Sequence, residues 1–437
     1  IEPPSSKIIF IGERVEHKND YSGPFASMFK LLKKHFSNSE IIGLAATHED
    51  IVALSNNGEL KVTLRESEIK VSKKLGQLSE GIYNITVDEE SDIVIRTGDL
   101  DFISYPYYVY QSLVEKESIL KLSENDFVRN YPVADSLIGT SNSYYQKNIF
   151  RWLDYSVNKS DNSIIGVPLF FNFQLLAYRW DYFTNLNNLA DEFRKKYHRQ
   201  FKGFNDPDDL IKFADLTFSV AADSFKSVLL CSNPNNIAMW YEWQTIFSIF
   251  YYQNHNQIKQ IDSVAEYKKF LLEDAAIDAT LMYLKLRKGT ESTNTTATSY
   301  DWDELIRNFY LSKNNSFIFI WTDSIPREDR NKSNFIYQVP PSFHLFEESW
   351  LFSITKKEES TTFTEEKIKF LNKYLTPEYQ KEYVENGGLP VHKDLLTSLD
   401  IWRKYPFIPP LWSVYLNPSS KDVLSKRDSF KDIDQAI

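Results

Sequence analysis

An aromatic block, NIAMWYEWQTIFSIFYYQNH, carries the side chains best suited to contact a ligand. Trp240, Trp243, Phe247 and Phe250 recur at helical spacing, which is typical of a stripe that faces a core. Tyr241 lies off that stripe, and flat indole or phenol rings also stack on the C–H faces of sugar rings. Two interpretations stand: core packing, or contact between a ligand and at least one of Trp240, Tyr241 and Trp243.

Neighbouring carboxylates are the other candidates for chemistry. Asp99 with Asp101, or Glu347 with Glu348, could in principle flank and hydrolyse a glycosidic bond. With 60 acidic residues in the chain, such pairs are expected by chance on a solvated surface. The sequence contains no P-loop, dinucleotide-binding turn, nucleophile elbow or zinc-protease helix. A glycoside-acting hydrolase using Asp99 or Glu242 therefore remains an alternative to simple binding.

Composition limits the classes of function. A chain of 437 residues exceeds what one hydrophobic core usually supports, so two or more lobes are expected. The net charge of −10, with Lys and Arg spread along the chain, argues against a nucleic-acid partner. Cys231 is the single cysteine, which cannot form an internal disulfide and leaves the redox compartment undetermined. The seven histidines show no zinc spacing, so neither a metal nor a cofactor is expected.

No segment has the character of a membrane span. The apolar stretch from Ile164 to Phe183 is interrupted by Asn172 and Arg179, which would be costly inside a bilayer. The first residues, IEPPSSK, have no signal-peptide features. Pro and Ser ahead of the first strand suit a short tether that follows a removed leader.

Hydrophobic periodicity predicts a β-α opening to the chain. KIIFIG forms a strand, and Phe25, Met28, Phe29, Leu32 and Phe36 recur at helical spacing after it. SDIVIRTGD is a second strand that ends in polar residues, which favours a parallel sheet with functional groups at the strand ends. Between these strands, an Asn-Asn-Gly turn signal indicates an inserted β-hairpin region.

The remaining pattern predicts further elements. SIIGVPLFF indicates a strand that Pro168 halts, because proline lacks a ladder donor. An amphipathic helix is predicted over residues 265–288, and NSFIFIWTD indicates a buried strand. Thr364 is the expected N-cap of the next helix. In TPEYQKEYVENGG, Thr376 caps a helix that starts at Pro377 and stops at the Asn-Gly-Gly run.

Several of these segments, in order, resemble the sugar-binding family of bacterial extracellular solute-binding proteins. GVPLFFNFQLLAYRWDYF resembles the family's crossover between lobes, with Arg179 where Asn is usual. GFNDPDDLIKFADL, SFIFIWTDSI and YQVPPSFHLFEESWLFSITKKEES resemble later elements, and KIKFLNKYLTPEYQKEYVENGGLPVHKDLL is the most specific match. The likeness runs from about Asp92 to Trp412. The family's Gly-Gly before Trp350 is replaced by Glu348-Ser349, and the region 61–87 is atypical.

The resemblance implies an α/β, two-lobed periplasmic-binding-protein (Venus flytrap) fold with hinge crossovers near Pro168, Glu348 and Pro390. The expected first lobe is 1–168 plus 347–391, and the second is 169–346 plus 392–437. Ligand would bind in the cleft between them. The site residues expected on this basis are Trp240, Tyr241, Trp243, Arg96, Asp99, Asn172, Trp321, Asp323, Trp350 and Trp412.

The implied function is reversible capture of a sugar or oligosaccharide without chemistry, followed by delivery to an ABC-type permease. The resemblance further implies a monomer located in the periplasm, outside the cell or anchored at its surface as a lipoprotein. The alternatives are the hydrolase and a non-transport protein that binds glycans or peptides on the same fold.

Overall fold

A computed structural model gives the structure of the chain. It describes residues 7–13, 23–46, 51–55, 58–60, 84–86, 94–96, 100–106, 113, 117–123, 145, 148–149, 152, 156–158, 160–179, 189–204, 208–210, 212–213, 216, 228–229, 243, 246–247, 269, 272–291, 306, 309–310, 317–322, 325, 335–339, 347–357 and 361–412.

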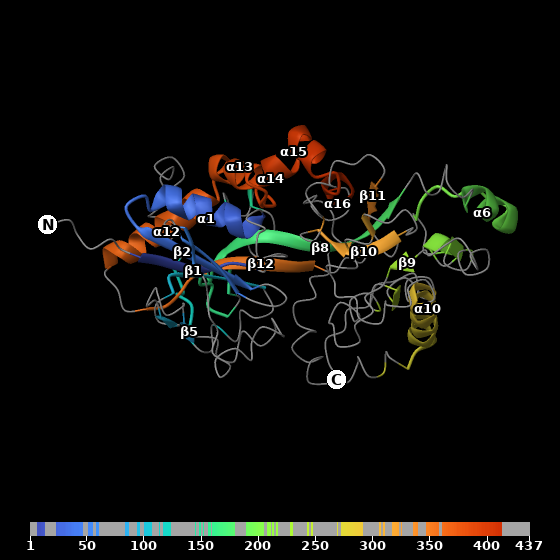
Figure 1. Cartoon of the computed structure of the whole chain (residues 1–437), viewed down its shortest axis with the longest axis horizontal. Coiled ribbons are helices and arrows are strands. Elements are labelled where there is room, and N and C mark those ends of the chain that lie inside the picture. Colours follow the sequence, from blue (N-terminus) through green and yellow to red (C-terminus); the bar gives the residue numbers. More distant parts are fainter. Residues whose placement is uncertain are drawn as a thin grey trace. The chain divides into compact units, whose positions relative to one another are not determined.

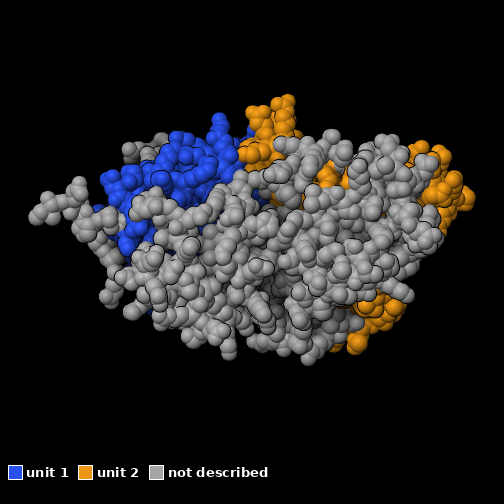
Figure 2. All heavy atoms as spheres, viewed as in Figure 1, with its two compact units in different colours: residues 1–171, 348–398 blue, residues 172–347, 399–437 orange. Residues whose placement is uncertain are grey.

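The chain forms two compact units (Figure 2). Unit 1 comprises Ile1–Phe171 and Glu348–Ser398, and unit 2 comprises Asn172–Glu347 and Leu399–Ile437. The chain passes between the units within two strands, β8 and β12, and once more between Ser398 and Leu399.

Unit 1 is built on a sheet with the strand order β4-β3-β2-β1-β7-β12-β8 (Figure 1). Its strands are β1 Lys7–Ile11, β2 Glu40–Ala46, β3 Ile51–Ser55, β4 Gly58–Leu60, β7 Phe102–Pro106, β8 Val167–Arg179 and β12 Glu347–Ile354. A separate antiparallel pair is formed by β5 Asn84–Thr86 and β6 Val94–Arg96. Central β1 is buried on both faces, which is typical of a strand covered on both sides.

The sheet of unit 1 is mixed, so the prediction of a parallel sheet was only partly right. β1 runs parallel to β2 and β7, whereas β3 is antiparallel to β2 and to β4. The short connection from β3 to β4 allows only an antiparallel hairpin, at the position of the Asn-Asn-Gly signal. β12, which comes from the C-terminal part of the chain, returns antiparallel to β7.

Phenylalanine rings hold helices to one face of this sheet. The helices of unit 1 whose full bounds are described are α1 Pro24–His35, α12 Thr361–Tyr374, α13 Pro377–Glu385 and α14 Lys393–Leu396. Phe10 of β1 contacts Phe25 of α1, with ring centroids 5.5 Å apart. Phe102 and Phe352, from β7 and β12, stack at 5.0 Å, and both contact Phe370 of α12. α1 and α12 therefore cover the same face of the sheet.

Two local predictions were wrong. Pro168 does not halt a strand: it is the second residue of β8, which continues to Arg179. A proline near the start of a strand leaves most of the ladder intact. Thr364 is not an N-cap, because α12 already begins at Thr361. The earlier start brings Phe363 onto the core, where its ring contacts Phe36.

The cap and stop of α13 agree with the sequence. Thr376 accepts a hydrogen bond from the backbone of Tyr379, and Pro377 is the first helical residue. Gly387 has a φ of 103°, in the left-handed region that glycine adopts without strain. The cap and the stop each depend on a few adjacent residues, so they can be predicted from the sequence without knowledge of tertiary contacts.

A buried carboxylate joins the strands of unit 1 to α12. Asp101 is fully buried; its Oδ1 lies 2.6 Å from the Nζ of buried Lys367 and also pairs with Lys357. Its Oδ2 accepts a hydrogen bond of 2.8 Å from the backbone of Ile9, and its carbonyl accepts one from Thr355. Asp101 thereby connects β1, α12 and the end of β12.

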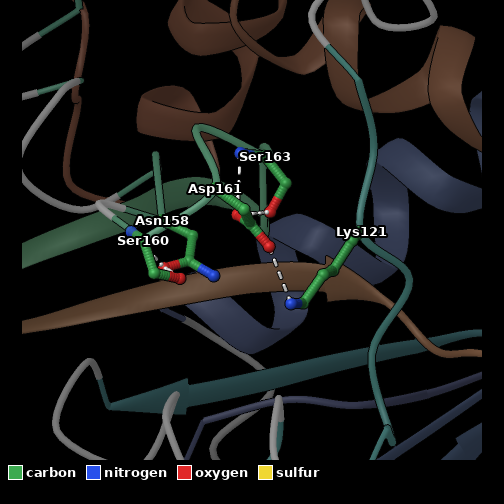
Figure 3. Close-up of polar contacts among 5 residues, drawn as sticks. All are labelled: Lys121, Asn158, Ser160, Asp161 and Ser163. Atoms are coloured by element: carbon green, nitrogen blue, oxygen red, sulfur yellow. Dashed lines mark hydrogen bonds and ion pairs between the residues drawn. The ribbon is translucent and has the colours of Figure 1, made fainter.

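A tight turn leads into β8 (Figure 3). The Oδ1 of Asn158 accepts hydrogen bonds from the backbone and hydroxyl of Ser160, and the Oδ1 of Asp161 does the same for Ser163. Lys121 donates to the Oδ2 of Asp161 at 2.9 Å. Hydrogen bonding by Lys121 and then Ser163 lowers the pKa of Asp161 to about 2. The turn is thus fixed by its own side chains and by one exposed ion pair.

Unit 2 is built around the remainder of β8. Its other elements are α6 Leu189–Tyr197, β9 Val228–Leu229, α10 Asp274–Glu291, β10 Phe317–Trp321, β11 Phe335–Gln338, α15 Leu399–Lys404 and α16 Ile408–Leu411. β10 and β11 both pair antiparallel with β8, and β9 pairs parallel with β10. The helix predicted over 265–288 is interrupted: Lys269 is helical, Leu272 and Glu273 form a turn, and α10 runs from Asp274 to Glu291. None of the helices in the described part of the chain is long and apolar enough to cross a membrane.

His35 is a buried titratable group at the end of α1. Its ring meets Phe36 and Phe370 edge-on, and its Nε2 lies 3.9 Å from the Oε2 of Glu366. Burial lowers the pKa of His35 to about 4, with Lys373 acting in the same direction and Glu366 opposing it. Folded unit 1 therefore holds this imidazole neutral at ordinary pH.

Replacing Asp101 by Asn should lower the free energy of unfolding by about 3–5 kcal/mol, since two ammonium groups lose their buried carboxylate. Urea unfolding followed by circular dichroism measures the change. Asp161→Asn is the control, because that pair is exposed and its loss should cost at most about 1 kcal/mol. Equal losses in the two variants would contradict the structural role assigned to Asp101.

Stability should fall as the pH drops from 6.5 towards 4. In this window the unfolded chain protonates His35 while the folded chain does not, so acid favours unfolding. The loss between pH 7 and pH 5 should be roughly 1–2 kcal/mol. His35→Phe keeps a ring against Phe370 and should flatten the profile. Some slope should remain, because burial also lowers the pKa of His392. If the pH dependence of stability were the same in His35→Phe as in the wild type, its attribution to His35 would be wrong.

Candidate functional site

Half of the predicted site residues can be placed with their side chains. Trp240, Tyr241, Asp99 and Asp323 lie outside the described residues. Arg96 is the last residue of β6, and only its place in that strand is described. The five that remain are Asn172, Trp243, Trp321, Trp350 and Trp412.

Trp243 is held in a fixed orientation in unit 2. Its indole Nε1 donates a hydrogen bond of 3.0 Å to the hydroxyl of Thr280 on α10. Thr280 in turn donates to the carbonyl of Ala276, at 2.7 Å, so the acceptor of the indole is itself oriented. The ring stacks on Phe247 at a centroid distance of 5.2 Å and an interplanar angle of 16°. The side chain is half-buried, so it combines packing with accessible ring surface.

Sequence reasoning missed Thr280. It lies on a helix far along the chain from Trp243, and the contact joins residues 37 apart. The one available signal was a hydroxyl within the alanine-rich start of α10, which is weak because threonine commonly bonds to the carbonyl four residues before it.

A buried polar group lies where β8 enters unit 2. The amide oxygen of Asn172 accepts a hydrogen bond of 3.0 Å from the hydroxyl of Thr322. That hydroxyl also accepts from the backbone of Phe173, whose carbonyl accepts from the backbone of Thr322. Gln174 is on the same side of β8 as Asn172 and pairs in register with Trp321. The structure thus brings Asn172 and Trp321 onto adjacent strands.

Trp350 belongs to unit 1, near the start of β12. Its ring stacks on Phe170 of β8 at 5.9 Å and 14°, and the residue is 5% exposed. Its Nε1 is buried and has no hydrogen-bond acceptor among the residues that the structure describes. A buried donor without an acceptor costs about 1–3 kcal/mol. The N–H of Trp350 is therefore a donor that a new acceptor would stabilise.

The five placed residues differ in how much of their surface is exposed to solvent. Asn172, Trp321 and Trp350 are buried, with at most 7% of their surface exposed. Trp243 and Trp412, the latter at the end of α16, are half-buried. Of the placed residues, these two indoles offer most ring surface to a solute.

The described residues give no support to a hydrolytic pair at Asp99 and Asp101. Asp101 is fully buried and ion-paired with Lys367 and Lys357, so its carboxylate serves the fold. Asp99 and Glu242 lie outside the described residues. In the part of the chain that is described, no group of three His, Cys, Asp or Glu side chains could hold a metal ion.

Comparison with known proteins gives matches by structure. No protein-family model matches the sequence, and no curated protein matches it. Among solved structures, maltose-bound MalE3 of T. maritima is similar with a TM-score of 0.58 and 13% identity, covering 94% of this chain and 88% of that one. The solute receptor AcbH, described as preferring β-D-galactopyranose, has a TM-score of 0.57 and 10% identity, covering 99% and 91%.

An enzyme is also among these neighbours. Thiaminase I from Bacillus thiaminolyticus is similar with a TM-score of 0.57 and 12% identity, covering 98% of each chain. The other structural neighbours are mostly sugar- and polyol-binding proteins. The resemblance seen in the sequence is confirmed at the level of fold: the chain has the α/β fold of the ABC sugar-binding proteins.

Proposed function

We propose that this protein is a solute-binding protein that captures a sugar or oligosaccharide between its two lobes and delivers it to an ABC-type permease. The likeness to MalE3 and AcbH over more than nine tenths of the chain is the observation that carries the proposal. The named ligands of the neighbours, among them maltose, ribitol and D-mannitol, are neutral and rich in hydroxyl groups. The ligand class proposed here is the same.

The chemistry of the placed residues is compatible with such a ligand. Trp243 presents a partly exposed ring in an orientation that Thr280 and Phe247 fix, which reduces the entropy lost when a sugar stacks on it. Trp412 offers a second partly exposed ring. The amides of Asn172 and Gln174, and the indole N–H of Trp350, supply hydrogen-bonding groups that apolar residues could not.

The lobes proposed for capture are 1–168 plus 347–391 and 169–346 plus 392–437, closing about the crossover segments. Closure would bury the ligand and create the surface that a permease recognises. Binding requires no cofactor and no covalent step. In this proposal the protein works in the periplasm or outside the cell, either free or anchored as a lipoprotein.

An enzyme is the second candidate, because thiaminase I has the same fold. Prolonged incubation with oligosaccharides and, separately, with thiamin, followed by mass spectrometry, distinguishes the two functions. Intact substrates support capture, and product formation supports catalysis. A non-transport protein that binds glycans or peptides is the third, and permease genes beside the coding sequence would favour transport over it.

A thermal-shift screen across sugars, polyols, oligosaccharides and peptides should identify a ligand that raises the melting temperature. A ligand at 100 times its Kd stabilises the folded state by about 2.7 kcal/mol. Trp243→Ala should abolish the shift and leave the unliganded melting temperature within a few degrees of wild type. Trp402→Ala, on α15, is the matched control and should retain the shift. No shift with any sugar or polyol would contradict the ligand class.

The hydroxyl of Thr280 should matter for affinity through Trp243. Thr280→Val keeps the shape and removes the acceptor, so the indole can turn and the affinity for the sugar found in the screen should fall about three- to tenfold. Thr280→Ser keeps the hydroxyl and should bind nearly as well as wild type. Calorimetric titration gives the affinities, and the emission maximum of tryptophan fluorescence reports the altered indole. Equal affinities for Val and Ser would show that the hydrogen bond does not orient the ring.

A further inference from the structure

Helix α10 carries a line of exposed aliphatic side chains. Ile277, Leu281 and Leu284 are 51%, 60% and 55% exposed. Their spacing of four and three residues places them on one face of the helix, here called the α10 stripe. The opposite face is buried through Ala275, Ala276, Ala279 and Tyr283. α10 therefore has apolar residues on both faces.

Single exposed leucines are ordinary, but three in register are not. A surface helix normally places polar residues on the face away from the core. Contiguous apolar patches on a soluble protein commonly mark an interaction site. The α10 stripe is thus a candidate contact surface, and the charges along the helix indicate its partner.

The charges of α10 are arranged nearly symmetrically about Leu281. Asp274 and Asp278 are exposed and lie in the N-terminal half of the helix. In the C-terminal half, Lys285 occupies a register position on the same flank of the stripe, and Lys288 occupies one in line with the stripe itself. The midpoint of positions 278 and 285 falls between Leu281 and Met282, and the midpoint of positions 274 and 288 falls on Leu281. An acidic half followed by a basic half is complementary to the same helix running in the opposite direction.

We propose that the α10 stripe binds the α10 stripe of a second copy of this chain, in antiparallel orientation, with a two-fold axis that passes beside Leu281, between positions 281 and 282. Such an interface is isologous, so every contact occurs twice. In this arrangement the Asp278 position of each copy opposes the Lys285 position of the other. The stripe of each copy would cover the apolar surface that its partner exposes to water. This association goes beyond the proposed function and needs no ligand.

The association should be weak and reversible. Three partly exposed aliphatic residues from each copy bury much less than the roughly 1,200 Å² of a stable interface. The protein should therefore be monomeric when dilute and form dimers as its concentration rises.

Sedimentation velocity of the full chain, between roughly 10 μM and 1 mM, tests the proposal. The wild type should show a concentration-dependent shift from monomer to dimer. Leu281→Glu places two carboxylates beside the two-fold axis and should weaken association at least about tenfold. Leu399→Glu is the matched control, because Leu399 is 66% exposed but lies on α15, and it should behave as wild type.

Charge exchange tests the antiparallel register. Asp278→Lys alone, or Lys285→Asp alone, places like charges together and should weaken association roughly two- to tenfold. The double variant Asp278→Lys with Lys285→Asp restores opposite charges and should recover the wild-type dimer. A wild type that stays monomeric throughout, a Leu399→Glu variant as weak as Leu281→Glu, or a double variant that is not rescued would overturn the proposal.

Discussion

The carboxylate of Asp101 is the interaction on which the architecture of unit 1 depends. It is fully buried, and such a charge is tolerated only with close partners. Its partners come from distant parts of the chain: the backbone of Ile9 on β1, Lys367 on α12, and Lys357 after β12. β12 and α12 are separated from β1 in the sequence by the residues of unit 2. The Asp101 contacts therefore join the two segments of the chain that make up unit 1.

The ion pairs of Asp101 also determine whether this carboxylate could take part in catalysis. Asp101 stands two positions after Asp99, so the sequence alone allowed the two carboxylates to be interpreted as a catalytic pair. A carboxylate that neutralises two lysines and caps a strand backbone has no freedom to act on a substrate. The fold thereby removes one member of the pair that the hydrolase alternative could have used.

The sequence predicted best what neighbouring residues determine. The cap at Thr376, the proline start at Pro377 and the left-handed stop at Gly387 were legible because each depends on a few adjacent residues. Pro168 and Thr364 were misjudged because pairing with β12 and the packing of Phe363 decide those positions, and both are long-range effects. The rings of the candidate site were predicted from residue type alone. Thr280, which orients Trp243, was not found, since the contact joins two elements whose proximity no local pattern reveals.

Aromatic residues of unit 1 serve to fill its core. Aromatic residues make up 15% of the chain. In unit 1 a group of phenylalanine rings forms part of the core, with contacts that link three strands of one sheet and two helices: Phe10, Phe25, Phe102, Phe352 and Phe370. Large rings need space. A Cβ on Gly43 would come within 2.7 Å of the ring of Phe10, and one on Gly388 within 2.2 Å of the ring of Tyr383.

A side chain in place of Gly43 or Gly388 would therefore overlap the neighbouring ring, whereas a smaller residue in place of the ring would leave a cavity. Rings that face a ligand must be among those that the core does not enclose. Trp243 and Trp412, which are half-buried, are two described examples.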